Sequence, residues 1–190
     1  MGNATYATLS PVLRPVLAVL AATLVLAGCG AEDPESKDYD PADLKGAPAP
    51  IAALHKQANE LLGGGEDAFK ERLAKLEGYP VVVNKWASWC GPCRAEFPHF
   101  QEHSVRLAKK VAFMGVNSND NDGDARGFLE KYPVPYPSYT DADLKIAELF
   151  KCPQCFPTTA FYDSKGKLVH VKYGQYEEDE LVADLERYAK

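Results

Sequence analysis

The sequence predicts an α/β fold in which a mixed central β-sheet carries helices on both faces. Residues 80–86 and 111–118 are mainly apolar with little polar alternation, which is typical of strands buried on both faces. Residues 158–163 and 167–174 are strand-like and are joined by a Ser-Lys-Gly turn, which predicts a hairpin. A strand, a helix and a strand followed by a hairpin and a helix therefore indicate both parallel and antiparallel pairing.

The helices of this fold are expected where apolar residues recur at spacings of three and four. Such residues line one face of a helix, whereas the intervening polar residues face water. Turn residues mark some of the ends, as at the three glycines that follow the first helix. The predicted helices cover residues 51–62, 66–78, 93–110, 123–132, 141–150 and 177–189.

The size and charge of the chain fit one globular domain. It has 190 residues, 46% of them apolar and 25% charged, which is enough for a domain with its own core. The formal net charge of −6 argues against a nucleic-acid partner, because too few cationic groups are present to neutralise a row of phosphates. Much of this charge is local, since six acidic and two basic residues lie between Ala31 and Lys45.

The first 28 residues have the pattern of an export signal. Arg14 precedes an apolar run from Pro15 to Ala27, which is short for a membrane span. The run closes on Leu-Ala-Gly-Cys, which resembles the bacterial lipobox, where a signal peptidase cuts before a lipid-carrying cysteine. We therefore expect residues 1–28 to be a lipoprotein signal peptide and Cys29 to anchor the protein in a membrane. An ordinary cleaved signal peptide and a short anchor helix are the alternatives.

The segment that begins at Cys29 is expected to be a spacer. Residues 29–49 are rich in Asp, Glu, Pro and Gly and poor in large apolar residues. They bury too little surface to offset the entropy lost on ordering, so we expect a flexible acidic linker. We expect residues 50–190 to form the compact domain, on the extracytoplasmic face of the cell membrane.

Two cysteines lie at the change from the strand 80–86 to the helix that follows it. Cys90 would face the unpaired amides of the helix N-terminus, which favours its thiolate. Gly91 allows a close turn, and Pro92 loses no hydrogen bond in the first helical turn. This arrangement predicts thiol–disulfide exchange, in which an exposed Cys90 attacks a partner disulfide and a more buried Cys93 resolves the mixed disulfide. A structural disulfide and half of a zinc site are the alternatives.

The segments WASWCGPCRAEFP and FPTTAFYDSKGKL together resemble the TlpA/ResA-type thioredoxin-like proteins of the bacterial cell envelope. The resemblance covers roughly residues 65–190. It implies a thioredoxin fold, thiol–disulfide oxidoreductase activity and no cofactor. It also implies reduction of disulfides in exported proteins, such as the haem-binding motifs of apocytochrome c, with electrons from a membrane donor.

The resemblance assigns further residues to the site. Pro157 matches the cis-proline that faces the active-site disulfide in this family, and Pro98 matches a proline inside the active-site helix. Glu96 matches a glutamate beside the cysteine pair, whereas thioredoxin itself has an aspartate in the preceding strand, at the position of Asn84. A partly buried carboxylate can have a raised pKa and carry the proton of the resolving thiol. A charge on the helix surface is the alternative for Glu96.

Two features depart from the family pattern. Lys85 stands where the family usually has an aromatic residue, and Cys152 and Cys155 form a second Cys-x-x-Cys directly before Pro157. We expect a structural disulfide that stiffens this loop, because the protein is predicted to be exported and no helix follows the second pair to favour a thiolate. A relay that exchanges with Cys90 and a zinc or iron–sulfur site with four thiolates are the alternatives.

The sequence thus predicts a membrane-tethered oxidoreductase that reduces disulfides of exported proteins and holds no metal. An oxidase or isomerase that introduces disulfides is the alternative enzyme, because a shift of about 30 mV, worth about 1.4 kcal/mol, is small enough for a few hydrogen bonds to supply. A metal-binding carrier that uses both cysteine pairs is the alternative of another class. Metal analysis with thiols counted separates carrier from enzyme, and the reduction potential of Cys90–Cys93 separates reductase from oxidase.

Overall fold

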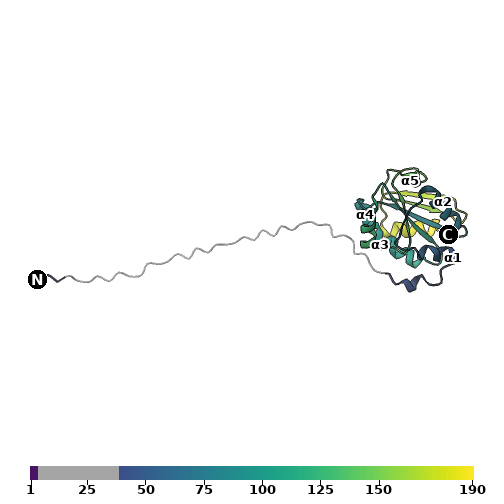
Figure 1. Ribbon diagram of the computed structural model, residues 1–190. Helices are drawn as coiled ribbons and strands as arrows, with labels where there is room; N and C mark the ends of the chain where they lie inside the picture. The colour runs from purple at the N-terminus through teal and green to yellow at the C-terminus, as the bar shows by residue number, and fades with distance from the viewer. Residues whose placement is uncertain (4–38) are drawn as a thin grey trace. The chain divides into compact units, whose positions relative to one another are not determined.

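The computed structural model describes residues 1–3 and 39–190. In that part of the chain the strands are β1 (Leu61–Leu62), β2 (Val81–Trp86), β3 (Ala112–Ser118), β4 (Ser138–Asp141), β5 (Thr158–Tyr162) and β6 (Leu168–Tyr173). They form one sheet, which lies among the helices in Figure 1. The order of its strands is β1-β4-β3-β2-β5-β6. Strands β1 to β4 are parallel to one another, whereas β5 pairs antiparallel with β2 and β6. The predicted mixed sheet is confirmed.

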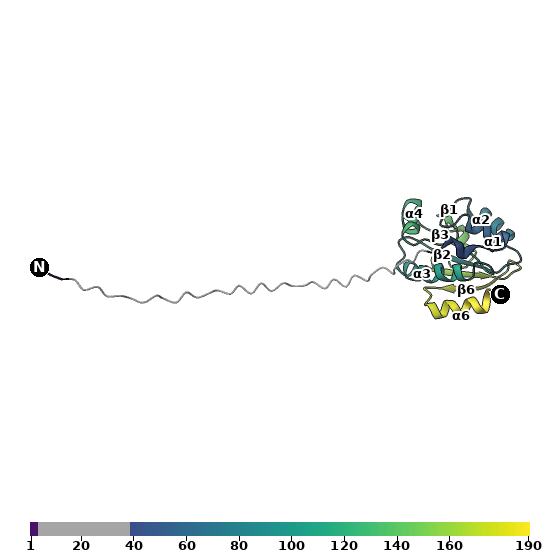
Figure 2. The same cartoon turned by 90° about the horizontal axis from the view of Figure 1, so that it is seen from below.

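Helices cover both faces of this sheet, as expected. They are the 3-10 helix η1 (Pro41–Leu44), α1 (Ala49–His55), α2 (Gly65–Lys75), α3 (Gly91–Arg106), α4 (Asp122–Lys131), α5 (Lys145–Glu148) and α6 (Glu178–Tyr188). One apolar cluster joins α3, α4 and α6 to the sheet, and the other joins α1, α2 and α5 to the opposite face (Figure 2). The helix η1 lies within the stretch expected to be a spacer.

Strand β2 passes through the centre of the molecule. All six of its residues are buried. Val82 and Trp86 pack in the cluster on the α3 side, whereas Val81 and Val83 pack in the cluster on the α1 and α2 side. This alternation follows from the two-residue period of a strand. The strand therefore delivers the chain to the start of α3, where Cys90 lies.

The first predicted helix is wrong in its second half. Helix α1 ends at His55, and Leu61–Leu62 instead form the edge strand β1, parallel to β4. Between them Asn59 adopts a left-handed backbone conformation, with φ of 63°. Its side chain donates to the carbonyl of Leu129 at 2.9 Å and accepts from the amide of Val134 at 3.1 Å. These long-range hydrogen bonds override the helical pattern of the sequence.

The predicted helix 141–150 is also mostly wrong, since α5 is only four residues long. Asp141 ends strand β4, which the sequence did not predict. Its carboxylate accepts hydrogen bonds from the amides of Ile146 at 2.8 Å and Ala147 at 3.0 Å, so it caps the short helix from outside. The other predicted helices are present, with small shifts at their ends.

Several expectations about export concern residues that the structure does not describe. The predicted signal peptide, apart from residues 1–3, lies outside the described residues, and so do Cys29 and the first part of the linker. Within the described residues, no helix is both long enough and apolar enough to cross a membrane.

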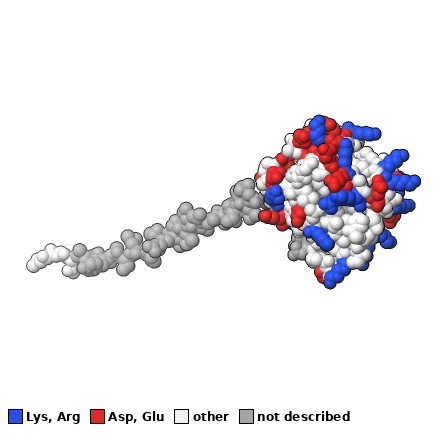
Figure 3. Space-filling view, turned by 45° about the vertical axis from the view of Figure 1, so that its right-hand side comes forward, with Lys and Arg blue, Asp and Glu red and all other residues white. Residues whose placement is uncertain are grey.

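On the face shown in Figure 3, Lys and Arg side chains lie among Asp and Glu side chains.

Candidate active site

Cys90 and Cys93 form a disulfide across the first turn of α3, with their Cα atoms 5.3 Å apart. Cys90 is the N-cap residue of the helix, and the amide of Cys93 donates a hydrogen bond to its Sγ atom at 3.1 Å. Gly91 and Pro92 occupy the first two helical positions. The hydrogen bond from the Cys93 amide and the helix N-terminus both favour negative charge on the sulfur of Cys90 when the pair is reduced.

Both sulfurs are nevertheless buried. Cys90 is only 3% exposed and Cys93 is 0% exposed, so the expectation of an exposed Cys90 is wrong, although the order of exposure is as predicted. The cause is packing, because Cys90 belongs to the apolar cluster around α3 and Phe156 packs against that cluster. An apolar environment disfavours the charged thiolate and therefore opposes the effect of the helix N-terminus.

Asp120, just after β3, anchors the loop that carries the cysteines. Its carboxylate accepts hydrogen bonds from the amide of Ser88 at 2.6 Å, the hydroxyl of Ser88 at 2.9 Å and the amide group of Asn117 at 2.8 Å. The indole of Trp89 donates to the carbonyl of Asn119 at 2.9 Å. Sequence reasoning missed this anchor. The available signal was that β2 and β3 are parallel neighbours, so their carboxyl ends meet at one edge of the sheet.

Glu96 lies one helical turn beyond Cys93 and is fully buried, which excludes the alternative of a surface charge. Its Oε1 atom accepts from the side-chain amide of Asn84 at 2.7 Å, and its Oε2 atom accepts from the backbone amide of Tyr176 at 2.9 Å. Burial raises the pKa of Glu96 to about 8, although both hydrogen bonds and the charge of Lys172 act to lower it. The carboxyl group therefore titrates in the range that a proton carrier needs at neutral pH.

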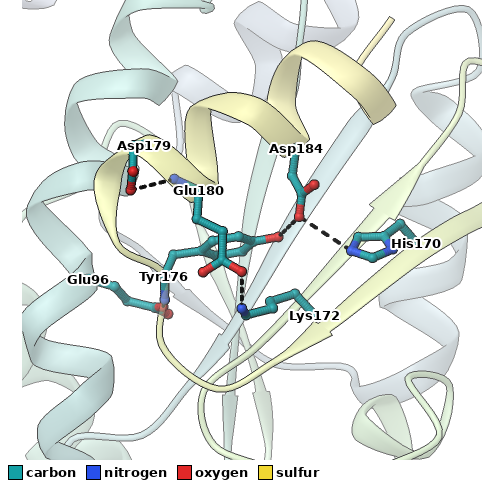
Figure 4. Close-up of polar contacts among 7 residues, drawn as sticks. All are labelled: Glu96, His170, Lys172, Tyr176, Asp179, Glu180 and Asp184. Atoms are coloured by element: carbon teal, nitrogen blue, oxygen red, sulfur yellow. Dashed lines mark hydrogen bonds and ion pairs between the residues drawn. The ribbon is translucent and has the colours of Figure 1, made fainter.

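A polar network holds the segment that contacts this buried carboxylate (Figure 4). The hydroxyl of Tyr176 donates to Asp184 at 2.7 Å, and the imidazole of His170 lies 3.4 Å from the same carboxylate oxygen. Lys172 on β6 pairs with Glu180 on α6. These contacts tie β6 to α6, so the backbone amide of Tyr176 between them is held in position.

The loop before β5 reaches the redox pair. The bond between Phe156 and Pro157 is cis, and the carbonyl of Pro157 accepts from the amide of Gly174 at 2.9 Å. The ring of Phe156 contacts the ring of Trp89, with 4.8 Å between the ring centroids. Trp89 directly precedes Cys90, so this loop forms one side of the active site.

Lys85 is fully buried, and its charge is directed at the same loop. Its Nζ atom donates to the carbonyl of Pro153 at 2.6 Å and lies 3.8 Å from the ring centroid of Phe156. Burial lowers the pKa of Lys85 to about 8, while the charge of Asp141 acts in the opposite direction. The ammonium group therefore remains mostly protonated at neutral pH.

Cys152 and Cys155 form the second disulfide that was expected, with their Cα atoms 5.4 Å apart. Both residues are half-buried, and the carbonyl of Cys155 accepts from the hydroxyl of Thr158 at 2.7 Å. Among residues 1–3 and 39–190, no group of three or more His, Cys, Asp or Glu side chains is arranged to hold a metal ion.

The comparison with known proteins agrees with this geometry. The model of the Redoxin family matches residues 46–188. The chain belongs to the Redoxin family. Over 167 residues this chain is 28% identical to the thiol-disulfide oxidoreductase ResA of Oceanobacillus iheyensis. The aligned segment covers 87% of this chain and 82% of ResA.

Solved structures support the same conclusion. The exposed lipoprotein thioredoxin Etrx1 of Streptococcus pneumoniae has a TM-score of 0.54 and 26% identity. The match covers 60% of this chain and 89% of Etrx1. A secreted Mycobacterium tuberculosis disulfide oxidoreductase homologous to E. coli DsbE has a TM-score of 0.54 and 26% identity. The match covers 60% of this chain and 85% of the Mycobacterium tuberculosis protein. The fold is thus thioredoxin-like, and this Redoxin protein is a ResA-type thiol–disulfide oxidoreductase.

Proposed function

We propose that this protein is held on the outer face of a membrane and reduces disulfides in exported proteins. The partner supplies an accessible disulfide, such as the oxidised haem-binding motif of an apocytochrome c that the TlpA/ResA resemblance implies. A membrane donor then restores the dithiol form of Cys90 and Cys93. The proposal concerns the direction of electron flow, the class of partner and the place of action.

The burial of the cysteine pair beside a carboxyl group supports the proposed direction of electron flow, from this protein to its partner. Cys90 is 3% exposed and Cys93 is 0% exposed, and Glu96 lies one helical turn further along α3. An apolar environment disfavours a thiolate, and so does the negative charge of Glu96 once that carboxyl group is ionised. A pair whose reduced, thiolate-bearing form is not stabilised prefers the disulfide state and therefore gives up electrons readily.

The reaction follows from the roles of the three side chains. The Cys90 thiolate attacks one sulfur of the partner disulfide, that bond breaks, and the leaving sulfur takes up a proton. Glu96 in its ionised form accepts the proton of Cys93 and then passes it to the departing second sulfur of the partner. The Cys93 thiolate then attacks Cys90, which forms the intramolecular disulfide and releases the second partner thiol. The partner gains two electrons and two protons, and this protein loses them.

The membrane tether is supported by the sequence before the domain. The apolar run that follows Arg14 ends on small residues directly before Cys29. The structural relative from Streptococcus pneumoniae is described as an exposed lipoprotein. Mass spectrometry of the N-terminal peptide from the membrane fraction tests the tether, and we expect a peptide that starts at lipid-bearing Cys29. An unlipidated peptide that continues through Cys29 contradicts it.

The reduction potential of Cys90–Cys93 tests the direction. It is measured by equilibration with glutathione or dithiothreitol buffers, followed by alkylation of free thiols. We expect a value close to the about −270 mV of thioredoxin rather than the about −120 mV of the oxidant DsbA. A value above about −180 mV, which is the potential of protein disulfide isomerase, contradicts the reductase and favours an oxidase or isomerase.

A further inference from the structure

Lys85 makes contacts that the redox chemistry does not need. Residues of β2 alternate between the two faces of the sheet, so Lys85 points away from the face on which Asn84 binds Glu96. Its ammonium group crosses to the loop between α5 and β5. There the carbonyl of Pro153 accepts its hydrogen bond at 2.6 Å. The ammonium group of Lys85, in the central strand β2, thus holds the loop that contains Pro153.

This loop is closed by the second disulfide at the point where Lys85 holds it. Pro153 lies between Cys152 and Cys155, so the ammonium group binds inside the disulfide-closed turn. Lys85 also pairs in register with Thr158, whose hydroxyl donates to the carbonyl of Cys155 at 2.7 Å. The loop is therefore fixed to β2 and β5 from both sides.

The same ammonium group supports an aromatic surface beside the redox pair. Its Nζ atom lies 3.8 Å from the ring centroid of Phe156, and that ring contacts Trp89 at 4.8 Å between centroids. Trp89 is 55% exposed and directly precedes Cys90. A line of contacts thus runs from Lys85 through Phe156 to an exposed tryptophan at the attacking cysteine.

We propose that Lys85 is a positioning residue for protein substrates, which holds Phe156 against Trp89 so that the two rings bind apolar or aromatic residues next to the substrate disulfide. The inference rests on the proposed function, because it concerns the surface that a disulfide-containing polypeptide meets on its way to Cys90. It names the partner by chemistry, as a segment whose disulfide is flanked by apolar or aromatic side chains.

The energetics distinguish this role from a purely structural one. Burying an ammonium group is costly, and the carbonyl of Pro153 that accepts its hydrogen bond is only half-buried, so removal of the charge relieves that cost without leaving a fully buried acceptor unpaired. Methionine at this position would fill the space without the charge or the hydrogen bond. If Lys85 only filled space, Lys85→Met would leave both stability and substrate binding close to those of the parent protein. The proposal instead predicts weaker substrate binding without a loss of stability.

Two synthetic peptides provide the test, each with one intramolecular disulfide. One carries phenylalanine on both sides of each cysteine, and the other carries serine. The dissociation constants of both peptides for the oxidised protein are measured by calorimetry, because two disulfides do not react with each other and only docking is observed. KM and kcat for reduction by the dithiol form are measured in parallel.

For Lys85→Met we expect about a fivefold weaker affinity and about a fivefold higher KM for the aromatic peptide, the range of a lost cation–π contact. The free energy of unfolding should be equal to or above that of the parent. Lys165→Met, at an exposed turn on β5–β6, is the matched control and should leave all these values unchanged. In a Phe156→Leu background, Lys85→Met should have little further effect, because Lys85 acts through that ring.

Parental affinity of Lys85→Met for the aromatic peptide overturns the inference. A loss of the same size in the Phe156→Leu background, or for the serine peptide, also overturns it, because Lys85 then does not act through the aromatic surface. A loss of affinity that is matched by a loss of folding stability assigns Lys85 a structural role only. If the dithiol form of the parent reduces neither peptide, the proposed function fails, whereas docking to the oxidised form still decides the role of Lys85.

Discussion

The side-chain amide of Asn84 donates a hydrogen bond to Oε1 of Glu96 at 2.7 Å, which joins the central strand to the redox helix. The side-chain oxygen of Asn84, Oδ1, is buried and has no hydrogen-bond partner among the described residues. An ionised Glu96 can only accept from Asn84, whereas a protonated Glu96 can donate to that oxygen once the amide turns over. The pair can therefore accommodate both protonation states of the carboxyl group, as a proton carrier requires.

Replacing Glu96 by Gln should slow the resolving step. The carboxylate accepts the proton of Cys93, so its loss should lower the single-turnover rate about 100-fold, at the low end of general acid–base effects. The parent rate should rise with pH through about 8, the pKa of Glu96, and the variant should keep only the rise that comes from ionisation of the thiols. Stopped-flow fluorescence of the pre-reduced protein provides the measurement. Glu102→Gln, an exposed change on the same helix, is the control, and an identical pH profile for Glu96→Gln would rule out the proton-carrier role.

The same substitution should change how stability depends on pH. Because the pKa of Glu96 is raised in the folded protein, its stabilising contribution is complete below pH 4.5 and is lost as pH rises towards 8. The parent should thus lose up to about 5 kcal/mol over this window relative to Glu96→Gln. Two histidines, His55 and His103, have lowered pKa values and act in the opposite direction, but they are present in both proteins. Urea unfolding at several pH values measures the difference, and parallel curves would contradict it.

Removing the carboxylate of Asp120 should loosen the loop before Cys90. Asp120→Ala leaves the donors of Ser88 and Asn117 without their acceptor, which should cost about 2 kcal/mol of unfolding free energy. Amide hydrogen exchange at Ser88 should become faster. Asp122→Ala removes an exposed carboxylate nearby and should cost less than about 1 kcal/mol. Equal effects of the two substitutions would show that Asp120 is not an anchor.

The second cysteine pair is predicted to be a clamp rather than a relay. Changing Cys152 and Cys155 together to serine should lower stability by less than the about 3 kcal/mol of a 15-residue loop, because the closed loop is so short. The potential of the first pair and its single-turnover rate should stay close to parental values. Steady-state turnover with the membrane donor is measured beside single turnover. Loss of the former with retention of the latter would establish a relay.

The fold could be predicted where its signals are local. The apolar run Val81–Val83 and the Gly-Pro dipeptide after Cys90 mark β2 and the start of α3 within a few residues. Strands β1 and β4 could not be predicted, because they are short and depend on distant contacts. Asn59 interrupts the first helix by binding groups 70 and 75 residues away, and no local pattern carries that information.

In the active site, too, features set by the local sequence could be predicted and features set by distant contacts could not. The cysteine pair is a local motif, so its position at the helix N-terminus follows from the sequence alone. The contacts of Lys85 and Asp120 do not, because Lys85 binds a carbonyl 68 residues later and Asp120 binds Ser88 from 32 residues away. The burial of Glu96 depends on Tyr176, 80 residues away in the chain. Long-range packing also explains why Cys90 is less exposed than its motif predicts.

In the proposed reaction, Cys90 attacks the partner and Cys93 resolves the mixed disulfide. Trapping with a disulfide-containing protein substrate tests it most directly, with non-reducing electrophoresis and mass spectrometry of the linked peptides. Cys93→Ser should accumulate a mixed disulfide through Cys90 and should not turn over, whereas Cys90→Ser should form no adduct and have no reductase activity. Parental turnover by Cys93→Ser, or an adduct through Cys93 in Cys90→Ser, would contradict the assignment.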